Sequence, residues 1–428
     1  MAESRQRYRW YLQVWLAVVL TFLFLMAVIN YLVDPYGMFD ADRVNRFNAS
    51  KPAAGSHVRL AKPYQVTGYA PHAIIGGNSR PEMGLNPANA CWPAEFRPVF
   101  NLALPGANVY MQARTLQHAI AGSDIRLVLW GLDFLDFLNR HTSTRNPLQW
   151  PPGRMEFEDR LKVNADGSEN RAYSRKRLQD YLQTLFSLDT VKDSLRTLSG
   201  QLDRYSSSVR RDGFNPALDY LEIIAWEGQG VLFQQKNREV SRLFSRPGLK
   251  LFQGESRWSP DFESISRLLQ YARKHNVTVV LFINPYHADY LLTLEMAGHW
   301  SQFESWKRRL ASLADEFSVE LWDFSGISLL STEQVPDPGD KKTTLKWFWE
   351  PAHYRMEYGD LMLGRMLQRP CGEGGTGPVG SVITTGNIDA HIMQLRTDML
   401  RYKEQHGPVI ERLRVQRSEP EKAISSEQ

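Results

Sequence analysis

A long apolar stretch near the N-terminus restricts this chain more than any other feature of its sequence. It runs from Tyr11 to Val33, and only Gln13, Thr21 and Asn30 interrupt it. A helix rises ~1.5 Å per residue, so a stretch of this length crosses the roughly 30 Å hydrocarbon core of a bilayer. We therefore expect it to form a transmembrane anchor, because no later segment is apolar over a comparable length.

The charges on either side of this stretch predict its orientation. Arg5, Arg7 and Arg9 precede it, whereas aspartates follow it, beginning with Asp34. Positively charged flanks stay in the cytoplasm, so we expect residues 1–10 there and the rest of the chain across the membrane. A cleaved signal peptide is the alternative. It would have a shorter apolar core and a small-x-small cleavage site, and no such site follows here, so an uncleaved anchor is favoured.

Short β-rich segments alternate with amphipathic helical patterns after residue 70. The expected strands are His72–Gly77, Val99–Leu104, Ile125–Gly131, Val277–Ile283 and Val319–Phe324. The expected helices are Val109–Ala121, Pro260–His275, Phe303–Phe317 and Arg355–Leu367. Apolar strands that alternate with helices are typical of a parallel sheet covered on both faces. The sequence thus predicts a doubly wound α/β domain over residues 34–370.

This alternation stops between about residues 140 and 254. The segment is polar, rich in Arg, Ser and Gln, and mostly helical in pattern, as in Arg175–Leu198, which predicts a helical insertion within the α/β domain. After the domain we expect a Gly-rich loop over 371–387, a charged helix over 388–415 and a disordered tail over 416–428.

Charge and cysteine content exclude one class of partner and leave one question open. The formal net charge is +4 over 428 residues, and no basic helix interleaved with aromatic residues is present, so a nucleic-acid partner is not expected. Cys91 and Cys371 are the only cysteines. Outside the cytoplasm they form either one disulfide or two buried free thiols, and the sequence does not decide between these.

Polar residues follow the first two expected strands. Within Ile74–Arg80 a buried strand ends in two glycines, and Ser79 then begins a helix. Ligands of doubly wound sheets bind beyond the carboxyl ends of the strands, so Ser79 occupies the position of a nucleophile; the alternative is a simple helix cap. In the loop Pro105–Asn108, Gly106 offers a backbone N–H and Asn108 an amide, which suit either an oxyanion hole or an ordinary turn.

The later strands end in further polar residues. Asp133 follows the third strand and either caps a helix or faces the same crevice as Ser79. Asn284 and His287 follow the fourth strand, and we expect them, together with Arg80, to bind substrate; turn chemistry is the alternative.

Glu350 and His353 stand three residues apart, just before the last expected helix of the domain. A carboxylate at this spacing can accept the Nδ1–H of the imidazole, which leaves Nε2 free to take a proton from a serine. A structural histidine in an aromatic loop is the alternative. The pair does not form the zinc motif HExxH and no other spacing indicates a metal, so neither a metal nor another cofactor is expected.

Together these motifs resemble the SGNH (GDSL-like) hydrolase superfamily over roughly residues 70–370. In that superfamily a serine follows the first strand, a glycine the second and Gly-x-Asn the third, and Asp-x-x-His lies near the C-terminus. The resemblance implies a three-layer α/β/α fold with Ser79 as nucleophile, His353 as general base and Glu350 as its acidic partner. It also implies that Gly106 contributes to the oxyanion hole.

Two residues depart from the pattern of the superfamily. Asp133 stands where an oxyanion-hole Asn is usual, and an ionised carboxylate would repel the developing negative charge; Asn108 offers a replacement amide. Glu350 replaces the usual Asp, so its longer side chain must reach His353 by a different path.

The chain is more closely similar to bacterial membrane-anchored SGNH-like proteins associated with cell-surface polysaccharide. The similarity lies in Val33–Gly37, Asn101–Asn108, Trp322–Ser325 and the Glu350–His353 region. Some relatives, such as the alginate O-acetyltransferase family, move acetyl groups onto exopolysaccharides. The resemblance implies a polysaccharide substrate and a single-pass position in the inner membrane with the main domain in the periplasm. Acetyl-CoA is not available there, so a transferase would need a membrane partner that supplies the acyl group.

Two functions fit this sequence. The first is an acyl-ester hydrolase or O-acyltransferase in which Ser79, activated by His353, forms an acyl-enzyme that water or a sugar hydroxyl then resolves. The second is a catalytically inactive glycan-binding or scaffold subunit of an exopolysaccharide export complex. Asp133 favours the second function, whereas the intact Ser79, Glu350 and His353 favour the first, which we adopt as the working hypothesis.

Overall fold

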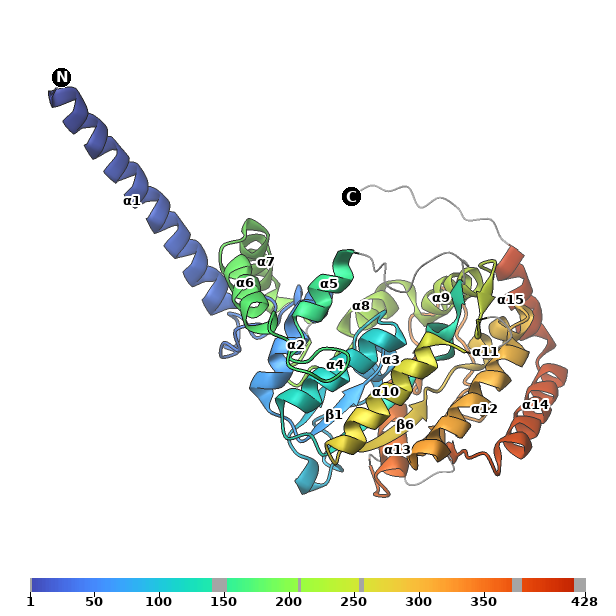
Figure 1. The fold of residues 1–428 in the computed structure, drawn as a ribbon. Helices are drawn as coiled ribbons and strands as arrows, with labels where there is room; N and C mark the ends of the chain where they lie inside the picture. The colour runs from blue at the N-terminus through green and yellow to red at the C-terminus, as the bar shows by residue number, and fades with distance from the viewer. Residues whose placement is uncertain (1, 141–151, 207–208, 254–257, 372–378, 419–428) are drawn as a thin grey trace.

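Most of the N-terminal helix stands apart from the rest of the protein, and only its last turns contact the domain. The computed structural model describes residues 2–140, 152–206, 209–253, 258–371 and 379–418. Helix α1 (Ala2–Val33) is continuous and projects away from the α/β domain (Figure 1). Its segment Arg5–Val33 is long and apolar enough to cross a membrane, and only 6% of its most apolar window is buried, so it is not a core helix.

A six-stranded sheet forms the centre of the domain, in the order β10-β7-β6-β3-β1-β2. Its strands are β1 (Ala73–Gly76), β2 (Val99–Asn101), β3 (Leu127–Leu132), β6 (Thr278–Ile283), β7 (Glu320–Asp323) and β10 (Ser381–Val382). The first five are parallel and correspond to the five expected strands. The sixth, β10, pairs antiparallel with β7 at the edge, within a segment where the sequence predicts only a loop.

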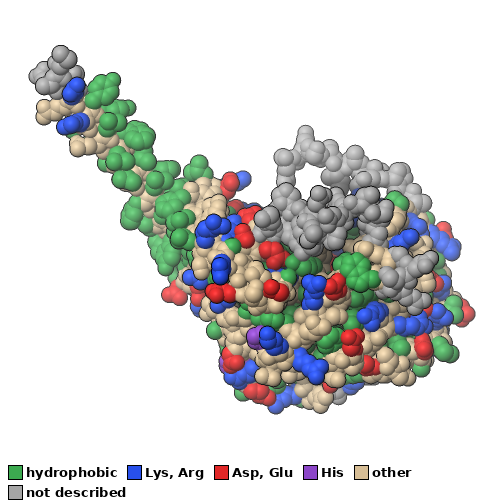
Figure 2. All heavy atoms as spheres, in the orientation of Figure 1, with side chains coloured by type: hydrophobic (Ala, Val, Ile, Leu, Met, Phe, Trp, Pro, Cys, Tyr) green, Lys and Arg blue, Asp and Glu red, His purple; other side chains and the backbone are tan. Residues whose placement is uncertain are grey.

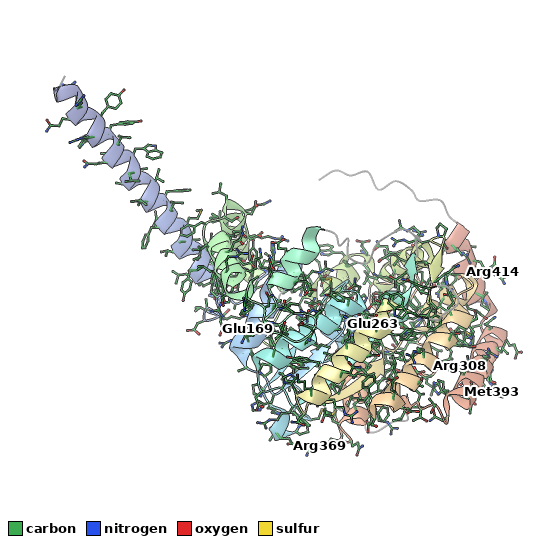
Figure 3. All side chains as sticks on the ribbon, viewed as in Figure 1. Glu169, Glu263, Arg308, Arg369, Met393 and Arg414 are labelled. Atoms are coloured by element: carbon green, nitrogen blue, oxygen red, sulfur yellow. A yellow bond between two sulfur atoms is a disulfide. The ribbon has the colours of Figure 1, made fainter. Side chains whose placement is uncertain are left out.

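Helices cover both faces of this sheet. Alternate strand residues point to opposite faces, so Val128 and Leu281 pack with α4 (Val109–Gly122), α10 (Pro260–Lys274) and α12 (Trp300–Phe317). Their neighbours Leu129 and Phe282 pack instead with α13 (Met356–Met366). These are the four helices expected from the sequence. The outer faces of α10 and α12 carry charged residues such as Glu263 and Arg308 (Figure 3).

The insertion is helical, as expected, and is bounded by the antiparallel pair β4 (Asn139–Arg140) and β5 (Leu249–Lys250). Its helices are α5 (Pro152–Asp159), α6 (Tyr173–Leu185), α7 (Leu188–Ser199), α8 (Leu218–Glu227) and α9 (Gln229–Phe244). Helices α6 and α7 pack beside the end of α1, whereas α9 packs against β8 (Phe348–Glu350) (Figure 1). Residues 141–151 and 207–208 of the expected insertion lie outside the described residues.

The C-terminal part is more ordered than expected. The single helix predicted over 388–415 is two helices, α14 (Ile388–Gln405) and α15 (Gly407–Ser418), which meet at His406. Helix α14 packs against α12, and α15 packs against α9 and α11 (Ala288–Met296). Part of the expected tail is therefore helical, while 419–428, like residues 372–378 of the Gly-rich loop, lies outside the described residues.

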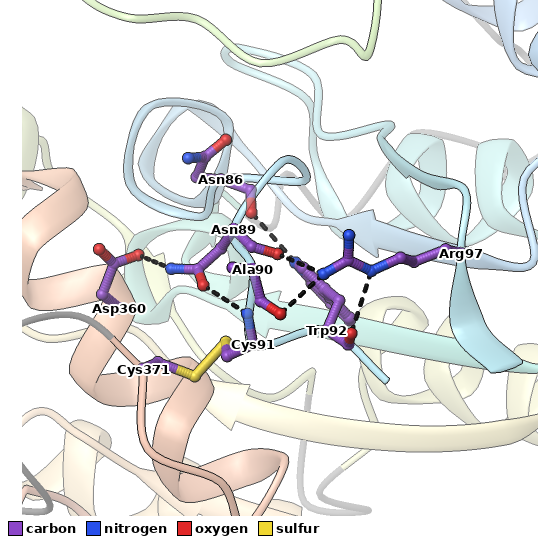
Figure 4. Close-up of a disulfide and its surroundings, with 8 residues drawn as sticks. All are labelled: Asn86, Asn89, Ala90, Cys91, Trp92, Arg97, Asp360 and Cys371. Atoms are coloured by element: carbon purple, nitrogen blue, oxygen red, sulfur yellow. Dashed lines mark hydrogen bonds between the residues drawn. A yellow bond between two sulfur atoms is a disulfide. The ribbon is translucent and has the colours of Figure 1, made fainter. Parts of the chain in front are cut away.

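Cys91 and Cys371 form a disulfide, which answers the question that the sequence leaves open. The bridge joins the loop before β2 to the segment after α13, with the two Cα atoms 5.3 Å apart (Figure 4). A hydrogen bond of 2.6 Å from Asn89 Nδ2 to Asp360 Oδ1 runs parallel to it. The loop and α13 are therefore fixed to each other both covalently and by polar contact.

Candidate active site

The turn after β1 presents Ser79 at the carboxyl edge of the sheet. Gly77 has a φ of +136°, and a Cβ there would lie 2.5 Å from Pro81 Cγ and 2.8 Å from Gly131 O, so no larger residue fits. Asn78 caps the following helix α3 (Ser79–Gly84), because its Oδ1 accepts a hydrogen bond of 3.0 Å from Arg80 N. The capping role considered for Ser79 thus falls to Asn78, and the Ser79 hydroxyl remains available.

The Ser79 hydroxyl contacts a histidine that is 274 positions later in the chain. Ser79 Oγ lies 2.7 Å from His353 Nε2, and His353 Nδ1 is hydrogen-bonded to Glu350 Oε1. Glu350 ends β8 and His353 begins β9 (His353–Tyr354), and the two residues pair across this tight antiparallel turn. The turn is the path by which the longer glutamate side chain reaches the imidazole.

Burial and charge set the protonation of this arrangement. Glu350 is 1% exposed. Burial would raise the pKa of its carboxyl. The attraction to the protonated form of His353 and the hydrogen bond from that ring outweigh burial, and a bond of 2.7 Å from Ala352 N adds to them, so the pKa lies below its ordinary value and the carboxylate is ionised next to the neutral imidazole as well. The ionised carboxylate accepts from Nδ1–H, which leaves Nε2 as the acceptor for the hydroxyl of the half-buried Ser79.

The loop after β2 runs next to the Ser79 turn, because Leu104 N donates a 2.9 Å hydrogen bond to Gly77 O. Gly106 is exposed in this loop with a φ of +62°, which favours glycine. Within the described parts of the chain, no backbone or side-chain group accepts a hydrogen bond from the N–H of Ser79 or Gly106. Asn108, also exposed, caps α4 through a 2.9 Å bond from Met111 N to its Oδ1.

Asp133 lies in the core and not at an oxyanion position. It is 1% exposed and forms an ion pair with Arg80. Its Oδ1 also accepts from Leu135 N at 2.9 Å and its Oδ2 from the hydroxyl of Tyr286 at 3.3 Å. Since its oxygens already accept these bonds and its charge is paired, Asp133 acts as a buried anchor. Of the two alternatives, it caps the short helix Phe134–Phe137, and it does not serve as an oxyanion-hole group at the position where the superfamily has Asn.

Arg80 is likewise turned away from any substrate. Its side chain is 5% exposed, and its guanidinium lies over the rings of Tyr286 and Tyr290, at 5.0 and 5.1 Å from their centroids. Its Nε donates to Ala352 O at 2.6 Å, immediately next to His353. The predicted substrate contact is therefore replaced by a positioning contact to the turn that carries the imidazole.

Asn284 and His287 also have structural environments. Asn284 is fully buried, with its Nδ2 donating to Leu132 O at 3.0 Å and its Oδ1 accepting from Tyr354 at 3.3 Å. His287 caps α11, and its Nε2 donates to Glu333 O at 3.0 Å. Burial lowers the pKa of His287. Asn284 and His287 therefore stabilise the turn after β6, as in the alternative considered from the sequence, and the structure shows neither in a position to contact a substrate.

The insertion contributes a residue that the sequence did not single out. The Tyr220 ring, on α8, meets the edge of the His353 imidazole at 6.3 Å between centroids and that of Trp349 at 6.0 Å. The side chain of Gln229 fixes this part of the insertion to β8, with bonds of 2.7 and 3.0 Å from its Nε2 to the carbonyls of Phe348 and Trp349. A tyrosine in an amphipathic helix carries no signal of such a contact.

Neither a scan against models of protein families nor a search of curated proteins finds a match to this chain. Within the described ranges, no three His, Cys, Asp or Glu side chains lie close enough together to hold a metal ion. Fold and site together define a mixed α/β protein with an apolar N-terminal helix and a hydrogen-bonded Ser-His-Glu arrangement at the carboxyl edge of its sheet.

Proposed function

We propose that this protein is a membrane-anchored serine acyl-ester hydrolase or O-acyltransferase with a doubly wound, SGNH-like α/β/α domain. The observation that carries the proposal is the hydrogen-bonded series from Ser79 through His353 to Glu350. A serine within reach of an imidazole that a buried carboxylate orients is the arrangement of an activated nucleophile.

The proposed reaction uses this series twice. Ser79 Oγ bonds to the acyl carbonyl carbon while its proton moves to His353 Nε2, and the tetrahedral intermediate then expels the leaving alkoxide, which takes that proton. Water or a sugar hydroxyl next gives its proton to Nε2 and attacks the acyl-enzyme, and Ser79 Oγ leaves and recovers the proton. Glu350 holds the imidazole in the required tautomer and stabilises the imidazolium in both halves.

The oxyanion of the intermediate needs hydrogen-bond donors that the protein does not already use. The backbone N–H groups of Ser79 and Gly106 donate to no group among the described residues, so they meet this requirement and are the donors that we assign. Asn108 sits at the start of α4 in the same loop, and its amide is the third candidate.

The place and the substrate class follow from the N-terminus and from the resemblance to polysaccharide-associated proteins. Helix α1 supports anchoring, and the arginines before it favour a cytoplasmic N-terminus with the catalytic domain in the periplasm of a bacterial cell. A surface polysaccharide emerging at that membrane is the proposed substrate. A membrane partner is the proposed acyl donor if the acceptor is a sugar.

The non-catalytic alternative, a glycan-binding or scaffold subunit, depended on Asp133. Because Arg80 pairs with that carboxylate inside the core, its charge is compensated and does not stand as an objection to an oxyanion nearby. The catalytic function is therefore the one that the geometry supports best.

A serine-directed fluorophosphonate probe tests this proposal on the full chain in detergent. The probe should label the wild-type protein and the control S301A, in which the serine lies exposed on α12, but not S79A. S79A should also lose hydrolysis of acetylated model glycans by roughly four orders of magnitude or more in kcat. Labelling or unchanged turnover by S79A would overturn the catalytic assignment.

A further inference from the structure

The α6–α7 hairpin of the insertion has its polar and apolar faces reversed. In an ordinary surface helix the apolar face is buried and the polar face meets water. Apart from Tyr173 at the start of α6, the buried residues of the two helices are polar, namely Lys176, Asp180, Thr184, Thr190, Ser194 and Thr197. The exposed residues include large apolar ones, namely Leu178 (59%), Leu182 (45%), Phe186 (45%), Leu188 (67%), Leu195 (58%) and, just after α7, Leu202 (82%).

The spacing shows that these apolar residues form stripes. Leu178 and Leu182 on α6 and Phe186 at its C-cap recur every four residues, so they lie along one face of that helix. On α7, Leu188 and Leu195 are seven apart and likewise share a face. A face of this kind is stable when its surroundings are apolar, and exposed contiguous apolar surface marks a contact with protein or membrane.

The position of the hairpin identifies those surroundings. The corner between α6 and α7 is bound to α1, because Asn30 Nδ2 donates to the carbonyls of Leu185 at 3.0 Å and Ser187 at 3.4 Å. On the other side, Ser194 Oγ donates to Asn30 Oδ1 at 3.0 Å. Asn30 is a polar interruption of the apolar stretch, is fully buried, and lies one helical turn before the end of α1.

The length of α1 places this corner at the surface of the bilayer. The 29 residues of Arg5–Val33 extend ~44 Å, which exceeds the roughly 30 Å hydrocarbon core, so the last turns of α1 lie at the boundary between lipid and water. Apolar side chains cover α1 down to the point where it meets the domain (Figure 2).

The charges near the stripes match the same surroundings. Of the five exposed charged residues on the two helices, Asp189 is acidic and four are basic, namely Arg175, Arg177, Lys192 and Arg196. An amphipathic helix that lies in a membrane interface carries leucine on the face toward the acyl chains and basic residues at the level of the headgroups.

From these observations we propose that the α6–α7 hairpin is a second membrane contact, which lies in the interface of the bilayer that α1 spans. Its leucines and Phe186 contact acyl chains, and its basic side chains contact anionic headgroups. The domain is then held at two points, so it cannot swing freely about the end of α1. This inference rests on the proposed membrane position of α1 and is independent of the catalytic assignment.

Single-cysteine labelling of the full chain tests the proposal, because both native cysteines are in the disulfide. The variants L182C and L195C report on the hairpin, and L20C reports on the anchor. M393C is the control, since Met393 is an exposed apolar residue on α14, on the far side of the domain from α1 (Figure 3). Each variant is labelled with the fluorophore NBD and reconstituted in vesicles of phosphatidylcholine and phosphatidylglycerol.

We expect blue-shifted emission at L182C, L195C and L20C, quenching by doxyl groups on the acyl chains, and protection from aqueous iodide. The M393C label should show no blue shift, no quenching by the doxyl groups and strong quenching by iodide. Replacing Leu188, Leu195 and Leu202 with serine, at sites more than half exposed, should preserve the fold and make the L182C label accessible to iodide.

Two outcomes would overturn the proposal. Iodide quenching of L195C as strong as that of M393C means that water covers the hairpin. Protection of L195C from both quenchers means that a protein covers it, either a second copy or another membrane protein. If L20C remains shielded in either case, the anchor stands and only the hairpin contact fails; if L20C is also open to iodide, the membrane position of α1 fails as well.

Discussion

Arg80, the residue after Ser79, forms a buried ion pair with Asp133. The same guanidinium donates to Ala352 O, so one side chain connects the strand-end aspartate to the turn that carries His353. The charged pair therefore supports the site from within the core, although neither partner is placed to touch a substrate.

Replacing Arg80 with methionine should destabilise the protein by about 3–5 kcal/mol, because the Asp133 carboxylate is left buried without its partner. The melting temperature in detergent measures this effect. The double variant R80M/D133N should recover much of the loss, since it removes the unpaired charge.

The matched control is R267M, which breaks the ion pair between Arg267 and Glu263 on the surface of α10. Its effect should stay below roughly 1 kcal/mol. If R80M lowers the melting temperature no more than R267M does, the buried pair of Arg80 and Asp133 does not stabilise the folded protein.

The variant E350Q should lower kcat by roughly 10³–10⁴-fold while leaving the fold intact. An amide in place of the carboxylate neither fixes the tautomer of His353 nor stabilises its charged form. Initial rates on an acetylated glycan measure the loss. Replacing the partly exposed Glu357, on neighbouring α13, with glutamine serves as the control and should change the rate little. A rate for E350Q close to that of E357Q would contradict the assigned role.

Tyr220 should matter through its ring and not through its hydroxyl. Y220F should act like the wild type, whereas Y220A should lower kcat/KM by about 2–10-fold, because the edge contact with His353 is lost. The comparison of the two variants under identical conditions separates the ring from the hydroxyl. If Y220F loses as much activity as Y220A, the hydroxyl has a role that the ring contact does not describe.

The pH dependence of stability should contain a contribution from Asp261. Burial raises the pKa of this carboxyl to about 7, although Asn139 donates a 2.5 Å hydrogen bond to it. Between about pH 4 and pH 7 the folded state thus holds a proton that the unfolded state has lost, so stability falls as the pH rises through this range.

The variant D261N keeps the acceptor for Asn139 and removes the titration. We therefore expect the wild type to lose about 2–3 kcal/mol relative to D261N between pH 5 and pH 8. Thermal unfolding of both proteins over this range tests the sign, and parallel curves would show that Asp261 does not titrate there.

The centre of the fold could be predicted because its signals are local. Strands such as Val277–Ile283 are apolar apart from Thr278. Ser259-Pro260-Asp261 is a clear helix start, and Ser259 caps α10 in the structure. Strand β10 has two exposed residues after a Gly-rich segment, and its existence depends on the edge of β7, to which no local pattern points.

The site was predictable in position but not in orientation. Residues at strand ends can face the crevice or the core, and the sequence does not distinguish these directions. For that reason Ser79 and His353 meet as expected, whereas Arg80, Asn284 and His287 turn inward. For the same reason the exposed apolar face of the α6–α7 hairpin could not be predicted. Periodicity defines two faces of a helix but does not show which of them the protein buries.

The disulfide has a consequence for the integrity of the chain. Cys91 and Cys371 lie on opposite sides of the whole insertion, so any single cut between α5 and α9 leaves two fragments that remain covalently joined. β1 and β3 stay on one fragment, and β6 and the histidine turn stay on the other, held together by the sheet as well as by the sulfur bridge. A nicked molecule would therefore migrate as two pieces only after reduction, and it would keep Ser79 and His353 in one molecule together with the apolar helix α1.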